Sequence, residues 1–445
     1  MKSFSPNQNQ GNLYRPILKQ IINLKDSLSI LADRMPWDEL ERSFERYYSP
    51  TGTPAKPIRL MASLLILKQL YNLGDETVVK AWVQNPYFQY FSGEAEFQWD
   101  FPCDPSDLVH FRNRIGEKGV EKIFEVSVQL QGKDAHSKEV IIDSTAQEKN
   151  ITYPTDAKLA VKVIKKCQKI AIKESIQLRQ SYTRTTKKLL LLQRFAHHPK
   201  NRKKATAAKR KLKTISGRLI RELRRKLEET TLVSYRPILE LFEKVISQKQ
   251  NDKQKIYSLH EPDVACIAKG KVAKKFEFGS KVSVAITRDT NVVVGIVNFT
   301  GNPHDSKTLE GTLEQVSRIL KASPKAVIAD RGYRGKTKCG ETEIIIPKPL
   351  GKKASEYQKT KTKKRFRRRA AVEPVISHMK SDFRMARNFL KGIKGDRINA
   401  LMAGAAYNFK RILRKIEKSI CWLILIPKSR CNFSGFWFSN QKLSY

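Results

Sequence analysis

The stretch AVIADRGYRG at residues 326–335 joins a short apolar run to an aspartate and two glycines. The apolar residues 326–329 predict a buried strand, and Asp330 follows at its end. A second short run, VIID at 140–143, also ends in an aspartate, Asp143. One aspartate at a strand end is most often a turn or capping residue. Together with a third acid, Glu373, in one strongly basic chain, the two aspartates indicate instead a common site.

The charge balance of the chain is strongly positive. Lys and Arg number 86 against 43 Asp and Glu, which gives a formal net charge of +43 over 445 residues. The excess positive charges repel one another in the folded state, and a polyanionic partner such as nucleic acid explains them best. No apolar signal segment opens the sequence, and the apolar run at 420–426 is too short to cross a bilayer, so we expect no membrane contact. Six scattered cysteines form no CxxC pair, which argues against a disulfide framework or a structural zinc site.

Residues 13–125 have the pattern of an all-helical region. The run at 58–71 is apolar nearly all round, as in a buried helix, and LGDE at 73–76 separates it from a second helix. Such a pair is either a DNA-binding helix-turn-helix or a plain helical hairpin, and the apolar first helix fits both. We expect an N-terminal helical domain at 1–130 that binds DNA.

A densely basic segment follows the first strand. Residues 161–226 contain 23 Lys or Arg, with Glu174 and Glu222 as the only acids. Leucines and isoleucines spaced along it predict helices, inserted at 158–250 between strands of one domain. A charge run is often only a solvated face, but this density of one sign favours contact with phosphates. The residues expected to make that contact are Lys203, Lys204, Lys209 and Arg210.

After the insertion the apolar period changes to two. The runs at 281–287 and 292–299 predict a hairpin, and residues 306–321 predict a helix that Asp305 would cap. Two strands, 326–330 and 342–346, and a late helix beginning near Arg369 or Pro374 complete an α/β domain.

A third acid, Glu373, stands at the start of the late helix, in RRRAAVEPVISHMK. On a continuous helix Phe366, Arg369, Glu373 and Lys380 would share one face. Pro374 disfavours helical geometry at Glu373, so Arg369 could fall off that face, whereas Lys380 would not. Carboxylates from separate elements suit hard divalent cations, and two such ions support phosphodiester displacement.

At these residues the sequence resembles the DDE transposases of bacterial insertion sequences, in the insertion-sequence-5 and -4 branch. Asp143 in VIIDST, DRGYRG at 330–335 and Phe366-x2-Arg369-x3-Glu373-x6-Lys380 correspond to the blocks of that family. The likeness covers most of residues 15–415. Phe366 replaces the usual Tyr, and the aromatic-rich tail at 419–445 is unlike the family's usual end.

The resemblance implies an RNase H-like catalytic domain at 136–418, with a mixed sheet flanked by helices. It implies that Asp143, Asp330 and Glu373 are catalytic and hold Mg²⁺, for which Mn²⁺ would substitute. It implies double-stranded DNA partners, both element ends and target, a homodimer assembled on DNA, and a bacterial cytoplasmic, nucleoid-associated location. The DNA-contacting residues would be Arg369, Lys380, Tyr333, Arg331 and Arg334, although Arg331 and Arg334 could equally pair with nearby acids. A catalytically inactive nucleic-acid-binding relative and a structure-specific nuclease on the same fold remain the alternatives.

Overall fold

The computed structural model describes residues 14–52, 54–194, 196, 198–249, 251–268, 275–335, 337–347 and 355–425, so most of the tail predicted at 419–445 lies outside it. The chain forms two units, residues 1–114 with 408–445, and residues 115–407. Two helices contribute to both units, α7 (Pro105–Gln129) and α15 (Gly392–Leu425). Helix α7 is interrupted at Gly116, which has a φ of 60° and a ψ of −160°. Glycine adopts this backbone conformation readily because it has no Cβ.

The first unit is helical, as the sequence predicts. Helix α4 is buried along almost its whole length because it is apolar on every side, and a four-residue turn joins it to α5. Asp75, at the start of α5, accepts hydrogen bonds from Lys68 of α4 and Arg112 of α7, each at 2.7 Å. This partly buried ion-paired cluster fixes the helical hairpin. The helices are α1 (Leu18–Ile21), α2 (Ser27–Arg34), α3 (Trp37–Glu45), α4 (Ile58–Leu70), α5 (Asp75–Gln84) and α6 (Pro86–Phe91).

The second unit contains a mixed sheet in the order β2-β3-β1-β5-β7-β6, with β4 paired to β3 and β8 to β1. Strand β1 runs antiparallel to β3, with Asp143 opposite Val284, and parallel to β5, with Ile141 opposite Ile328. This confirms the predicted fold class of a mixed sheet flanked by helices. The strands are β1 (Glu139–Lys149), β2 (Ala265–Ala268), β3 (Phe276–Thr287), β4 (Val293–Phe299), β5 (Ala326–Ile328), β6 (Lys338–Cys339), β7 (Thr342–Ile345) and β8 (Arg387–Asn388).

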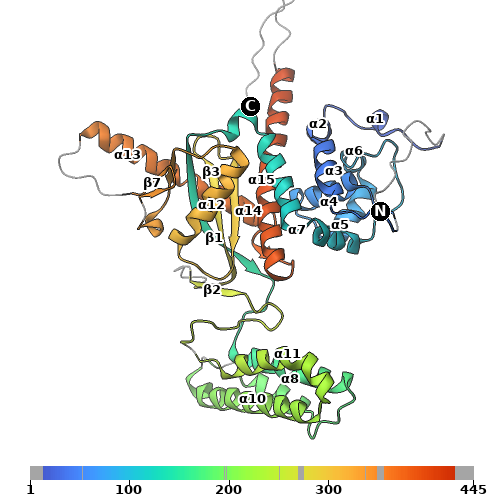
Figure 1. Ribbon diagram of the computed structural model, residues 1–445, viewed down its shortest axis with the longest axis vertical. Coiled ribbons are helices and arrows are strands. Elements are labelled where there is room, and N and C mark those ends of the chain that lie inside the picture. The colour runs from blue at the N-terminus through green and yellow to red at the C-terminus, as the bar shows by residue number, and fades with distance from the viewer. Residues whose placement is uncertain are drawn as a thin grey trace, which may run out of the picture. The chain divides into compact units, whose positions relative to one another are not determined.

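Helices cover this sheet. Helix α12 (Asp305–Leu320) packs on β3 and β4, while α14 (Val372–Ser381) packs against β1 (Figure 1). The approach of α12 is close, because a Cβ on Gly295 of β4 would lie 2.6 Å from Val316. The remaining elements are the basic helix α13 (Glu356–Arg369) and the short 3-10 turns η1 (Gly132–Ala135) and η2 (Arg331–Tyr333).

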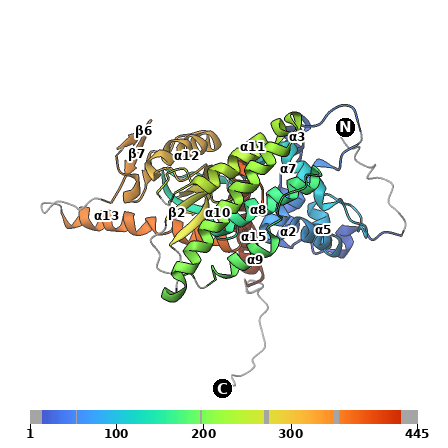
Figure 2. The ribbon, with the colours of Figure 1, turned by 90° about the horizontal axis from the view of Figure 1, so that it is seen from below.

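Residues 156–247 form four helices with a core of their own. They are α8 (Asp156–Lys173), α9 (Thr183–Leu191), α10 (Pro199–Lys226) and α11 (Glu229–Ser247). Helices α8, α10 and α11 lie side by side (Figure 2), and between them Ile164, Leu212 and Phe242 are fully buried. Because the apolar sides of the helices face this core, the lysines and arginines are left on the outside.

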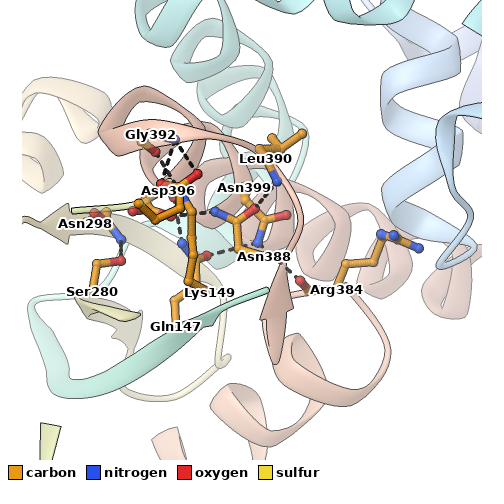
Figure 3. Close-up of polar contacts among 11 residues, drawn as sticks. Gln147, Lys149, Ser280, Asn298, Arg384, Asn388, Leu390, Gly392, Asp396 and Asn399 are labelled. Atoms are coloured by element: carbon orange, nitrogen blue, oxygen red, sulfur yellow. Dashed lines mark hydrogen bonds and ion pairs between the residues drawn. The ribbon is translucent and has the colours of Figure 1, made fainter. Parts of the chain in front are cut away.

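A buried polar cluster joins the two ends of this helical insertion to the sheet (Figure 3). Lys149, the last residue of β1, donates to Asp396 at 2.7 Å and to the carbonyl of Gly392 at 3.0 Å. Its ammonium also lies 3.3 Å from Glu261, in the segment that returns from the insertion. Asn388 of β8 donates to the same Asp396 at 2.6 Å. The Lys149 side chain is only 2% exposed, so the cluster fixes these segments inside the protein.

Candidate active site

Asp143 lies on β1 just beyond the part of the strand that pairs with β5. Its Oδ1 accepts a hydrogen bond from the backbone N–H of Ser144 at 2.8 Å. The pKa of Asp143 is raised to about 6, chiefly by burial and also by the negative charges of Asp330 and Asp305, while that N–H and Arg369 act in the opposite direction. Asp143, Asp330 and Asp305 therefore lie close enough to influence one another electrostatically.

Asp330 follows β5 and caps the turn η2. Its Oδ1 accepts from the backbone N–H of Gly332 at 2.8 Å. A Cβ on Gly332 would lie 3.0 Å from Asp330 Oδ1 and 2.8 Å from Asp305 Oδ2. Glycine is thus required here to leave room for the two carboxylates.

Arg369 connects Asp143 to Glu373. Its guanidinium lies 3.9 Å from Asp143 Oδ2 and 3.8 Å from Glu373 Oε1. Helix α13 ends at Arg369 and α14 begins at Val372, but the residues between them keep helical backbone angles. The pairing four residues apart therefore survives the break before Pro374. The Glu373 side chain is 64% exposed, in contrast to Asp143 at 21%.

Asp305 is part of this cluster, and the prediction that it caps α12 is wrong. The helix begins at Asp305 itself, and His304 is the capping residue, accepting from the N–H of Ser306. Asp305 Oδ1 instead accepts from Ser144 Oγ at 2.7 Å and from Lys281 Nζ at 2.9 Å. Burial alone would raise the pKa of Asp305, but these hydrogen bonds outweigh it and hold the pKa below its ordinary value.

The residues predicted to contact DNA fall into different environments. Arg331, Arg334, Lys203, Lys204 and Arg210 are exposed, and Lys380 is half-buried on α14. Lys209 forms an ion pair with Asp156 at 2.5 Å, which fixes the start of α8 to α10. Tyr333 is 1% exposed, so the prediction that it contacts DNA needs correction. Tyr333 is the buried residue of η2.

The site also depends on contacts that sequence reasoning missed. Arg365 of α13 pairs with Glu139 at the start of β1, and Arg368 donates to the carbonyls of Arg288 and Asp289 at 2.7 and 2.9 Å. These contacts hold α13 against β1 and the turn between β3 and β4, and so place Arg369. Arginines in a basic run give no signal in the sequence that would single out these two.

The donor chemistry at Asp143 and Asp330 fits a divalent cation, since both offer carboxylate oxygens on neighbouring strands. Within the described part of the chain, no group of three or more His, Cys, Asp or Glu side chains is already assembled to hold a metal ion. Glu373 is the residue that stands apart, exposed and paired with Arg369. A divalent ion would therefore be held by the two aspartates.

Comparison with known proteins finds transposase domains in two parts of the chain. Residues 16–114 match a family model described as a transposase domain, and residues 248–409 match one described as a transposase DDE domain. The second range includes Asp330 and Glu373, whereas Asp143 precedes it. A Rhizobium meliloti protein named "Uncharacterized protein ORF8 in nfe locus" is 39% identical over 203 residues, which are 44% of this chain and 98% of that protein. No solved structure matches the chain.

The mixed sheet flanked by helices is consistent with a DDE transposase domain. The chain belongs to the DDE transposases of insertion sequences. Proteins of this family bind DNA and generally use divalent metals. In the described residues, no helix is both long enough and apolar enough to span a membrane.

Proposed function

We propose that this protein cuts DNA at the ends of its insertion sequence and joins the freed 3′-hydroxyls to target DNA, with Asp143, Asp330 and Glu373 as its catalytic acids. The observation that best supports this proposal is the convergence of Asp143 and Asp330 from neighbouring strands, with Arg369 between Asp143 and Glu373. It acts in the bacterial cytoplasm, in contact with the nucleoid, as a homodimer assembled on DNA.

The acids have distinct tasks in this proposal. A pair of Mg²⁺ or Mn²⁺ ions, when bound, supplies activation of the attacking oxygen and stabilisation of the leaving oxygen. Asp143 and Asp330 would hold these ions through carboxylates that are fixed, since each accepts a backbone hydrogen bond. A DNA phosphate that reaches Arg369 competes with Glu373 for the guanidinium. Glu373 is thereby freed to turn toward the aspartates as substrate arrives.

Helix α10 supplies the surface proposed for the DNA backbone. At 100° per residue, seven of its exposed cations fall within about 120° of one side of a helix about 42 Å long. These residues are Lys203, Lys204, Arg210, Lys211, Arg218, Arg221 and Arg225. The N-terminal unit differs, since residues 14–114 contain 12 Lys or Arg and 13 Asp or Glu. DNA binding by that unit thus rests on its α4–α5 hairpin, and the phosphate contacts come from elsewhere in the chain.

Incubating the purified full-length protein with duplex DNA from either side of its gene tests this function. With Mg²⁺ or Mn²⁺ we expect nicks at the element ends that leave 3′-hydroxyls, followed by joined products when target DNA is added. Cleavage of branched DNA without regard to element sequence would support the structure-specific nuclease instead. Binding to the ends without any cleavage would support the inactive relative.

A further inference from the structure

We propose that Ser144, held by the Asp305–Lys281 ion pair, is a positioning residue for the carboxylate of Asp143. This inference rests on the function proposed above, and it concerns a residue outside the three catalytic acids. Ser144 follows Asp143 on β1, so its side chain points to the opposite face of the sheet from the Asp143 side chain.

Ser144 donates two hydrogen bonds, one from its backbone and one from its side chain. Its backbone N–H donates to Asp143 Oδ1 at 2.8 Å, and its Oγ donates to Asp305 Oδ1 at 2.7 Å. The first bond fixes the rotation of the Asp143 carboxylate, and the second fixes the residue that donates it. Because both bonds involve one residue, movement of Ser144 disturbs the catalytic carboxylate directly.

Asp305, the anchor that accepts the hydrogen bond from Ser144, is itself held in place. Lys281 on β3 donates to Asp305 Oδ1 at 2.9 Å and to the carbonyl of Pro303 at 2.6 Å. Its side chain is only 11% exposed, so this ion pair is largely screened from solvent. The pair joins β3 to the first turn of α12, and neither partner belongs to the proposed metal ligands.

The same anchor lies beside the second catalytic aspartate. Asp305 Oδ2 and Asp330 Oδ1 both border the space that a Cβ on Gly332 would occupy, at 2.8 and 3.0 Å from it. Asp305 therefore touches Ser144 with one oxygen and faces the turn of Asp330 with the other. This arrangement sets the positions of Asp143 and Asp330 relative to one another before any ion binds.

Variants of Ser144 separate positioning from packing. Ser144→Ala removes the hydroxyl, while Ser144→Thr keeps it and Ser144→Val has the shape of Thr without it. Ser283→Ala is the matched control, since Ser283 is buried and lies directly opposite Ser144 on β3. Full-length variants are compared by Mn²⁺ titration without DNA, by cleavage of element-end duplex at several Mn²⁺ concentrations, and by thermal unfolding.

We expect Ser144→Ala and Ser144→Val to weaken Mn²⁺ binding about three- to tenfold, which corresponds to the loss of one charge-assisted hydrogen bond. Their cleavage should be slow at low Mn²⁺ and should recover in part at high Mn²⁺. Ser144→Thr and Ser283→Ala should stay within about twofold of the wild type.

Three results decide the matter. Equal Mn²⁺ affinity and cleavage in Ser144→Thr and Ser144→Val would overturn the proposal, since the hydroxyl would then have no role; this comparison holds even if the Ala variant does not fold. A loss in Ser283→Ala as large as in Ser144→Ala would overturn it as well, by showing a general packing defect. A wild-type protein that neither binds Mn²⁺ nor cuts DNA would overturn the proposed function itself.

Discussion

Arg369 Nη1 lies 3.9 Å from Asp143 Oδ2, although the two residues stand on opposite sides of the helical insertion in the chain. The fold brings them together because β1 carries Asp143 in the centre of the sheet and α13 ends beside that strand. The guanidinium offsets the repulsion among acids that converge there without an ion. A cation in this place competes with metal ions and attracts phosphate.

Replacing Arg369 by Gln should therefore change two affinities in opposite directions. Mn²⁺ binding should strengthen by on the order of 1 kcal/mol, about fivefold, because a positive charge near the aspartates is removed. DNA binding should weaken, and the plot of log K against log salt should become shallower by about 0.9 if one phosphate contact is lost.

Calorimetric Mn²⁺ titration and DNA binding at several salt concentrations would measure both effects. Arg367→Gln is the control for charge alone, since Arg367 is an exposed arginine on the same helix. Weaker Mn²⁺ binding in Arg369→Gln than in this control would show that Arg369 organises the acids rather than competing with the ion.

The exposed side of α10 gives a second prediction. Replacing Lys203, Arg210 and Arg221 by Glu should lower DNA affinity for every sequence alike, because phosphates carry no sequence information. Each lost contact should make the salt slope shallower by about 0.9.

The comparison variant replaces Arg236 and Lys244 by Glu on α11, where Glu229, Glu240 and Glu243 already lie among the cations. It should bind DNA with nearly the wild-type slope. If both variants behave alike, the effect comes from net charge and α10 is an ordinary solvated helix.

The sequence predicted the elements more fully than the contacts. Apolar periodicity places β5 and α12 to within a few residues, because burial imposes a period that can be read locally. The prediction that the first strand ends at Asp143 is wrong, since β1 continues to Lys149. Asp305 was misassigned because a cap and the first helical residue look alike in sequence. Its true partner, Lys281, is one lysine among many, and only the pairing of β3 with β1 brings it near Ser144. The prediction that Tyr333 contacts DNA is wrong because the turn after Asp330 sets the direction of its side chain. No pattern in the sequence encodes that direction.

The cluster in Figure 3 predicts a large effect on stability from one substitution. Lys149→Met should lower the free energy of unfolding by about 3–5 kcal/mol, because it leaves Asp396 and Glu261 buried without their cation. Denaturant unfolding followed by circular dichroism would measure the change. Arg224→Met breaks the exposed pair with Glu243, 40% and 43% exposed, and should cost at most about 1 kcal/mol. Equal losses in the two variants would mean that the buried cluster contributes no more than a surface ion pair.

Asp330→Asn separates DNA chemistry from DNA binding. The substitution keeps the shape of the side chain and its acceptor for the Gly332 N–H, but removes the charge needed to hold a divalent ion. Cleavage and strand joining should fall by at least about a thousandfold, which is roughly 4 kcal/mol of lost transition-state stabilisation. DNA binding without metal should be unchanged or slightly stronger, since one negative charge near the phosphates is gone.

Glu343→Gln is the matched control for Asp330→Asn, because it removes an exposed acid from the neighbouring strand β7 and should cut at the wild-type rate. Gel assays of nicking and joining with Mg²⁺ and with Mn²⁺, beside filter binding in EDTA, would report all three properties. Cleavage by Asp330→Asn at the wild-type rate would remove Asp330 from the catalytic acids. Loss of DNA binding together with cleavage would instead mean that Asp330 maintains the fold of the turn η2, and circular dichroism of the same sample would reveal that damage.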